Sequence, residues 1–246
     1  MDKLLIQLFS AFLIFVVVVF SILNFSIKDK KFTCNRYILN TYLYIILTFN
    51  IIALLMFSME YYKINYNPSL LMFLGTFLIT IGCIFLMHNI SADQIILKHL
   101  VWLAFVLLLG LIFFPMYISY KNKKHLIVSA IATTLLLFMG LSIVAYLKPE
   151  WISLSWGSIL LLLLIGGIIM EVFTLVFYRK NLEKVRPLLK AMTYFFIVVF
   201  MVFILYDTKR LQINAKECVK ADYIKESLGL FLDIFNIFVR ILSLNR

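Results

Sequence analysis

Residues 195–203 read FFIVVFMVF, residues 160–169 read LLLLLIGGII and residues 15–20 read FVVVVF, and each stretch is apolar on every side. A membrane β-strand would instead alternate polar and apolar residues over about ten positions, so these stretches predict helices. The whole chain is 64% hydrophobic and 14% charged, with a mean hydropathy of +1.03. Soluble proteins carry about 25% charged residues, and this composition therefore excludes a soluble, collagen-like or disordered protein.

Working outward from these stretches, eight apolar runs reach the length of about 20 residues that a helix needs to cross a bilayer. They cover residues 4–26, 36–58, 68–90, 95–118, 125–147, 152–178, 187–206 and 224–243. The longest connection is expected at residues 207–223. The sequence predicts an all-α polytopic membrane protein with no separate soluble domain.

The first run, residues 4–26, has two interpretations. It follows Lys3 and could be a signal sequence, cleaved or uncleaved. Its apolar stretch exceeds the usual signal core of about 7 to 15 residues, and no A-x-A cleavage site follows, which favours a true span. We therefore expect an N-terminal hydrophobic helix and basic loop over residues 1–31, followed by a helical membrane domain over residues 32–246.

The charge of the chain is +11. Lysines and arginines divide 12 to 11 between the two alternate sides of the predicted bundle, so the positive-inside rule assigns no orientation. Basic loops of this kind face anionic headgroups of the lipid bilayer, which is the first expected partner. Nucleic acid is not an expected partner, because no loop combines a dense basic patch with aromatic residues at stacking spacing.

The three cysteines, Cys34, Cys83 and Cys218, are far apart in the sequence and form no CxxC pair. This spacing indicates neither a zinc ribbon nor a disulfide framework, and it does not identify the redox compartment.

The most informative polar residue is Asp233, near the middle of the last apolar run. A carboxylate at the centre of a membrane helix costs about 2.5 to 3.5 kcal/mol on insertion scales. Asn236 and Arg240 follow three and seven residues later, so they share a helical face with Asp233, together with Gly229 and Glu226. This polar face is predicted to look into the bundle. Asp233 either serves a function there, pairs with Arg240 or caps a neighbouring helix.

Asp207 ends the seventh run, where an interfacial residue without a role is an equal alternative. Successive helices are antiparallel, so the last helix runs back alongside the seventh. Asp233 falls about ten residues into this returning helix. A last helix entering at about residue 224 would place Asp233 about 13 Å deep, a turn or two deeper than Asp207. If the two carboxyl groups meet, they cannot both ionise cheaply and share one proton. Deprotonated, Asp207 and Asp233 would offer a hard oxygen site suited to Ca²⁺.

Two further polar residues lie in or near the membrane. Glu171 has Gly167 and Thr174 on its face, and it is either buried against a Lys, Arg or hydroxyl partner or lines a pore. His88, at the end of the third run, is expected at the interface and has an unperturbed pKa near 6.5.

Enzyme signatures are weak. The chain lacks an HExxH zinc helix and a nucleotide-binding glycine loop. Gly140 and Ser142 lie in MGLSIV, which lacks the second glycine of G-x-S-x-G. An intramembrane aspartyl protease would have glycine directly before its second aspartate, where this chain has Leu232. We expect no enzyme, and an intramembrane hydrolase is the weakest alternative.

The C-terminal third resembles a known family. The stretch LYDTKRLQ, residues 205–212, and ADYIKESLGLFLDIFNIFVRILSL, residues 221–244, resemble the end of the Bax inhibitor-1 family, also called transmembrane Bax inhibitor motif, lifeguard or Golgi anti-apoptotic proteins. That family has YDTQ, then DYI, then LYLDxxNLFxxLL. FTCNRYILNTYLYIIL, LLLGLIFFPMYISY and VSAIATTLLLFMGLSIVAY resemble its earlier helices, so the similarity covers about residues 32–244.

The resemblance implies a seven-helix bundle in which six helices surround a central last helix, here preceded by an extra N-terminal hydrophobic helix. Asp207 and Asp233 match the paired aspartates that sense pH in this family. Bacterial relatives use an arginine at the end of the second helix as a latch on the first aspartate, and His88 falls near that place. Lys209 replaces the usual glutamine and is expected to add a cation beside Asp207.

The resemblance also implies a function. Known members leak Ca²⁺ across endoplasmic reticulum, Golgi or bacterial plasma membranes, and eukaryotic and viral members restrain apoptosis. We therefore expect a pH-sensitive calcium leak channel with Asp207 and Asp233 as gate and possible Ca²⁺ site. His88, Asn236, Arg240 and Glu171 are expected as a latch or as supporting polar residues. Ca²⁺ is the permeant ion, and no cofactor is expected. The alternative is a non-conducting protein that inhibits apoptosis by binding partners such as Bcl-2-type proteins or calcium-release receptors.

Overall fold

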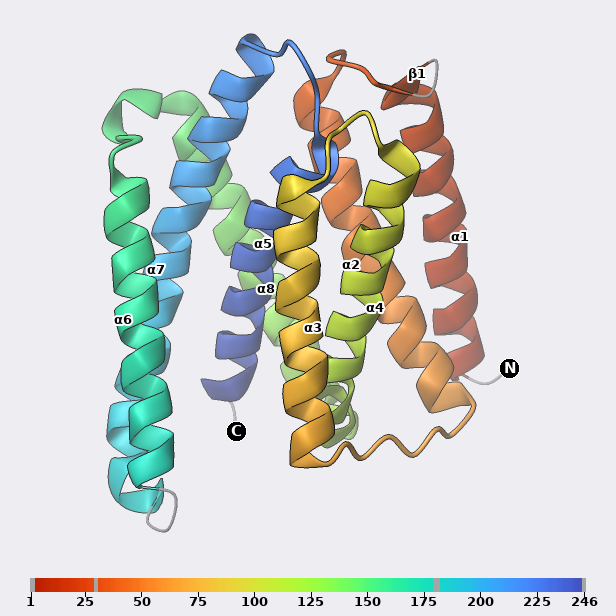
Figure 1. Ribbon diagram of the computed structural model, residues 1–246. Coiled ribbons are helices and arrows are strands. Elements are labelled where there is room, and N and C mark those ends of the chain that lie inside the picture. The colour runs from red at the N-terminus through yellow and green to blue at the C-terminus, as the bar shows by residue number, and fades with distance from the viewer. Residues whose placement is uncertain (1–2, 29–30, 179–181, 245–246) are drawn as a thin grey trace. The chain divides into compact units, whose positions relative to one another are not determined.

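The computed structural model describes residues 3–28, 31–178 and 182–244, and within them the chain is almost entirely helical (Figure 1). In this part of the chain, eight α-helices are each long and apolar enough to cross a membrane. They are α1 (Lys3–Phe25), α2 (Tyr37–Tyr61), α3 (Leu70–Asn89), α4 (Ile95–Tyr120), α5 (Lys124–Leu147), α6 (Trp156–Phe177), α7 (Leu182–Lys216) and α8 (Tyr223–Leu244), with a short 3₁₀ helix η1 (Pro149–Trp151) before α6. The predicted all-α polytopic fold and its eight apolar helices are confirmed.

The end of the seventh helix differs from the prediction. α7 does not stop at residue 206 but continues through the polar stretch 207–216, so the expected connection at 207–223 is wrong. Hydropathy falls at Asp207 because the side chains become polar, whereas the backbone hydrogen bonds that define a helix do not depend on side-chain polarity. The connection between α7 and α8 shrinks to residues 217–222.

The basic loop expected after the first helix contains a small hairpin. β1 (Ile27–Lys28) pairs antiparallel with β2 (Lys31–Phe32), with Ile27 opposite Phe32 and Lys28 opposite Lys31. The hydroxyl of Thr33 donates to the carbonyl of Phe25 at 3.3 Å. The chain therefore leaves α1 and approaches α2 through an ordered turn.

The chain divides into two compact units. Unit 1 comprises residues 1–122 and 215–228, and unit 2 comprises residues 123–214 and 229–246. In unit 1, α2 packs against α1 and α4, and α3 packs against α4. α8 contributes its first turns to unit 1 and its remainder, from Gly229 onward, to unit 2. It is also the most buried of the eight spans, with half of its positions buried, compared with 11% for α6.

Unit 1 contains a disulfide between Cys34 and Cys218, whose Cα atoms are 5.9 Å apart. The spacing of the cysteines indicated no such bond, because 184 residues separate the two positions. Cys83 is free and buried in α3. The pairing of Cys34 with Cys218 was missed from the sequence, whose cysteine spacing indicated no disulfide framework.

Candidate functional site

Asp233 lies on the buried face of α8 in unit 2, and only 6% of the residue is exposed. Its Oδ2 atom is buried and has no hydrogen-bond partner among the groups that the structure describes. Burying a carboxylate oxygen without a donor is costly, so such groups are rare unless they have a role or carry a proton. Asp233 therefore stands out from the apolar residues around it.

The carboxyl group of Asp207, on α7, lies directly against α8 one turn before Asp233. A Cβ atom built on Gly229 would lie less than 3.0 Å from Asp207 Oδ2, closer than real Cβ contacts allow. Gly229 thus provides the room that brings Asp207 to the backbone of α8. Asp207 and Asp233 interact electrostatically, and the structure brings the two predicted residues together within unit 2.

The polar continuation of α7 changes where Asp207 lies along its helix. Asp207 is nine residues before the end of α7 at Lys216, and Asp233 is ten residues after the start of α8 at Tyr223. At 1.5 Å per residue these positions are about 14 and about 15 Å from the ends of their helices. The expected depth difference of a turn or two stays a prediction, and the contact at Gly229 is about one turn from Asp233. The described parts of α7 and α8 are continuous helices, so this approach involves no unwound turn.

Arg210 supplies the cation of the site. Its Nη1 atom is 3.7 Å from Asp207 Oδ1, one turn along α7, and its charge also acts on Asp233. Lys209, which was expected to add this cation, instead donates to the carbonyl of Ile152 before α6. Arg210 was missed from the sequence, although its position three residues after Asp207 is a spacing at which helical side chains meet.

Glu171 and Arg240 form a separate pair between α6 and α8. The two guanidinium nitrogens donate to the two carboxylate oxygens at 2.6 and 2.7 Å. The guanidinium also lies over the ring of Phe196, 4.1 Å from its centroid. Arg240 is therefore the partner of Glu171, and the alternative in which it pairs with Asp233 is not what the structure shows.

The remaining predicted residues lie elsewhere. Asn236 donates to the carbonyl of Leu232 in its own helix at 2.8 Å. His88 is exposed near the end of α3 in unit 1, with Nδ1 3.1 Å from the carbonyl oxygen of Ile84. Its role as a latch on Asp207 stays a prediction. Among the described residues, no three His, Cys, Asp or Glu side chains gather in a way that could hold a metal ion.

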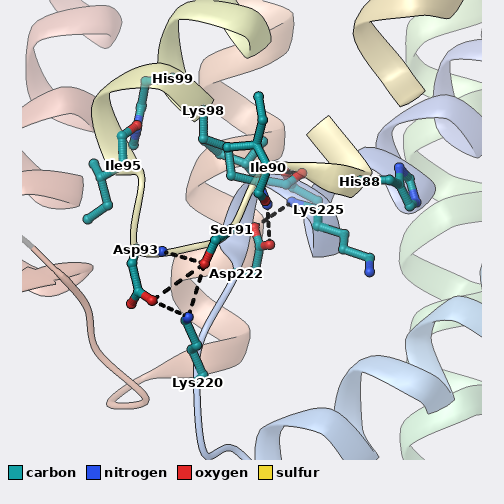
Figure 2. A network of polar contacts seen from close by, with 12 residues as sticks. His88, Ile90, Ser91, Asp93, Ile95, Lys98, His99, Lys220, Asp222 and Lys225 are labelled. Atoms are coloured by element: carbon teal, nitrogen blue, oxygen red, sulfur yellow. Dashed lines mark hydrogen bonds and ion pairs between the residues drawn. The ribbon is translucent and has the colours of Figure 1, made fainter. Parts of the chain in front are cut away.

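A second polar network, in unit 1, was missed from the sequence (Figure 2). Lys98 of α4 is fully buried, donates to the carbonyl of Ile90 at 2.9 Å and forms an ion pair with Asp222. Lys220 forms an ion pair with Asp93 and also donates to Ser91 at 3.2 Å. The signal that could have found this network is the lysine at position 98, near the start of an otherwise apolar run.

The ion pair with Lys220 affects the ionisation of Asp93 in the connection between α3 and α4. The hydrogen bond from Lys220 holds the pKa of Asp93 below its usual range. Asp93 is therefore ionised throughout the neutral pH range. Its charge stays constant over the pH range in which the buried aspartates of unit 2 could gain or lose a proton.

Comparison with known sequences agrees with the C-terminal motifs. The sequence model of one family, described as "Inhibitor of apoptosis-promoting Bax1", matches residues 34–245. The match begins after α1 and includes both helices that carry the aspartate pair. No curated protein matches the chain.

Proposed function

Because the chain belongs to the Bax inhibitor family, we propose that it is a pH-sensitive calcium leak channel rather than an enzyme, with Asp207 and Asp233 as its gate. The observation that carries the proposal is the approach of Asp207 to α8 at Gly229, one turn from the buried Asp233. We place the channel in the endoplasmic reticulum or Golgi membrane of a eukaryotic or virus-infected cell, or in a bacterial plasma membrane.

The gate works through the charge on the pair. With one shared proton, the two carboxyl groups can hydrogen-bond to each other and hold α7 against α8. When that proton is lost, the two negative charges repel in a medium that screens them poorly, which favours separation of the helices. The charged groups that act on Asp233 are Asp207 and Arg210.

Ca²⁺ is the permeating ion in this proposal, not a resident cofactor. It prefers six to eight oxygen ligands, and two carboxylates supply at most four. Water would complete the shell, so the pair would hold the ion weakly enough to release it. Weak binding of this kind is what conduction requires.

The test is Ca²⁺ flux into proteoliposomes that contain the purified full-length protein, measured at pH 6 and pH 8. We expect the wild-type flux to differ between the two pH values, and Asp207→Asn, Asp233→Asn and the double variant to lose that difference. Asp93→Asn is the control: Asp93 is exposed and stays ionised over this range, so its removal should leave the pH profile unchanged. If the double variant keeps both the wild-type flux and its pH profile, the proposed gate is wrong.

The same variants separate ion conduction from restraint of apoptosis. If the double Asn variant conducts no pH-dependent current and still protects cells fully, protection proceeds by binding partners such as Bcl-2-type proteins or calcium-release receptors. Loss of protection together with loss of flux would tie both effects to the aspartate pair.

A further inference from the structure

The disulfide of unit 1 joins two connections that are distant in the sequence. Cys34 lies between the hairpin and α2, and Cys218 lies between α7 and α8. Their Cα separation of 5.9 Å is within the range of about 4.4 to 6.8 Å that a disulfide requires. Cys34 is exposed, and Val219, next to Cys218, is 97% exposed. The bond therefore forms at the surface of unit 1, where thiol reagents can reach it.

The neighbours of the two cysteines are held together by contacts that do not involve sulfur. The hydroxyl of Tyr223, the first residue of α8, donates to the carbonyl of Thr33 and accepts from Asn40 Nδ2 at 3.1 Å. Asn40 also donates to the carbonyl of Asn35 at 2.9 Å. Thr33 and Asn35 flank Cys34, so these hydrogen bonds would bring the two thiols together before any bond between them forms.

Ion pairs fix the same connection to a third segment. Lys220 pairs with Asp93, and Asp222 pairs with the buried Lys98, so residues on both sides of Ala221 are bound to the turn between α3 and α4 or to the start of α4. Figure 2 shows Lys220 joined to both Ser91 and Asp93. Residues 31–36, 90–94 and 217–222 therefore meet at one end of unit 1, and the connection between α2 and α3, residues 62–69, lies at the other end (Figure 1).

We infer that Cys34 and Cys218 are oxidised in the mature protein, and that this end of unit 1 faces an oxidising compartment, the lumen of a secretory organelle or the cell exterior. Disulfides persist on that side of a membrane and are rare on the cytosolic side. Since α2 crosses the bilayer once, residues 62–69 then face the cytosol. The disulfide thus assigns the orientation that the nearly equal division of loop charges left open. This inference does not depend on the proposed channel activity.

The bond forms by thiol–disulfide exchange with a disulfide-bearing oxidoreductase or glutathione disulfide. The thiolate of one cysteine attacks the oxidant to give a mixed disulfide, and the second cysteine then displaces the reduced carrier. Two electrons pass to the oxidant, whose two sulfur atoms leave as thiols with the two protons from Cys34 and Cys218.

The first test counts oxidised cysteines in the full-length protein expressed in eukaryotic cells. Membranes are dissolved in SDS with N-ethylmaleimide to block free thiols, reduced, and treated with a polyethylene-glycol maleimide that adds visible mass. Wild type should gain two tags, as should Cys83→Ala, whereas Cys34→Ser and Cys218→Ser should gain none. A wild-type protein that gains no tag, or a dimer that disappears on reduction, would overturn the intramolecular bond.

The second test measures orientation with single reporter cysteines in a Cys34→Ser, Cys83→Ala, Cys218→Ser background. Asn67→Cys and Val219→Cys place exposed thiols at the two opposite ends of unit 1. In sealed microsomes, a membrane-impermeant maleimide should label Asn67→Cys at once and Val219→Cys only after detergent. The reverse pattern would overturn the orientation even if the disulfide is present.

Discussion

Gly229 determines how closely the Asp207 carboxylate can approach α8, because a methyl group at this position would overlap Asp207 Oδ2. We predict that Gly229→Ala pushes this carboxylate away from Asp233. Such overpacking costs about 1 to 3 kcal/mol, and the better helix propensity of alanine returns about 0.5 to 1 kcal/mol of it. Thermal unfolding in detergent should therefore show a net loss of about 0 to 2.5 kcal/mol, and the pH profile of Ca²⁺ flux should change.

Gly140→Ala is the matched control for this substitution. Gly140 lies inside α5, and nothing lies within 4 Å of the position that its Cβ would take. This variant should gain the helix propensity without the clash, so stability should stay equal or rise while the flux profile stays that of the wild type. Equal behaviour of the two alanine variants would contradict the role assigned to Gly229.

Arg210 is predicted to tune the aspartate pair through its charge. Its guanidinium lies 3.7 Å from Asp207, and a nearby cation favours the ionised form of a carboxyl group. Removing it in Arg210→Gln should let the pair keep its shared proton to higher pH, so the midpoint of the flux profile should move upward. Lys209→Gln, whose parent side chain binds Ile152 instead, should leave the midpoint in place. A downward movement in Arg210→Gln would refute this assignment.

The aspartate pair could be predicted from the sequence, and its surroundings could not. Asp207 and Asp233 were identified by the motifs around them and by the cost of placing a carboxylate in lipid. Whether Arg210 or Lys209 faces the pair depends on the rotation of α7, which the nearly uniformly apolar run of residues 187–206 leaves undetermined. The partner of Glu171 depends in the same way on how α6 and α8 pack.

The helix ends were predicted well where turn or capping residues mark them. They were predicted poorly where only the polarity of the side chains changes while the helix continues. Ser69 accepts a hydrogen bond from the backbone of Met72 at the start of α3, close to the predicted boundary at residue 68. α7 has no such mark at residue 206, and its polar continuation to Lys216 was therefore taken for a loop.

The ion pair between Glu171 and Arg240 is predicted to stabilise the packing of α6 on α8. Hydrogen bonds to charged groups contribute about 1.5 to 3 kcal/mol, and both side chains here are about four-fifths buried. Arg240→Met and Glu171→Gln should each lower the free energy of unfolding by about that amount. The double variant should lose less than the sum, because neither partner is left unpaired.

Lys148→Met is the control for the Glu171 and Arg240 variants, because it removes an exposed ion pair from the same unit. Lys148 and Glu150 are 3.8 Å apart and mostly exposed, and exposed ion pairs contribute about 0 to 1 kcal/mol. Loss of the ion pair between Lys148 and Glu150 should therefore change the free energy of unfolding by an amount that the same experiment can hardly measure. Strict additivity of the Arg240 and Glu171 substitutions would show that the two side chains act separately.

For the whole molecule, the disulfide is predicted to be the largest single contribution to the stability of unit 1. A bond that closes 184 residues strongly restricts the unfolded chain, and native disulfides typically contribute about 2 to 4 kcal/mol. Cys34→Ser with Cys218→Ser should lower the unfolding free energy by about that much, as should reduction of the wild type. Cys83→Ala should not respond to reductant differently from the wild type. Equal stability of oxidised and reduced protein would exclude this contribution.

The membrane class and the succession of helices followed from composition and run length, since only long apolar helices satisfy the backbone in lipid. The disulfide and the network of Lys98 and Asp222 did not, because their members are brought together by tertiary packing and carry no local spacing signal. The loop charges did not assign an orientation because they are almost evenly divided, and the orientation that we infer rests on the paired cysteines.

The length of α7 links this protein to the thickness of its bilayer. A helix of 35 residues is about 52 Å long, whereas the hydrocarbon layer measures about 30 Å. Its apolar run, residues 187–206, is about 30 Å long and matches that layer, so the polar ends protrude and the inclination of the helix follows the depth of the surrounding acyl chains. Because Asp207 lies on this helix, a sterol-rich membrane and a thin one would hold the same carboxylate at different inclinations, so lipid composition becomes a control on the pair in its own right.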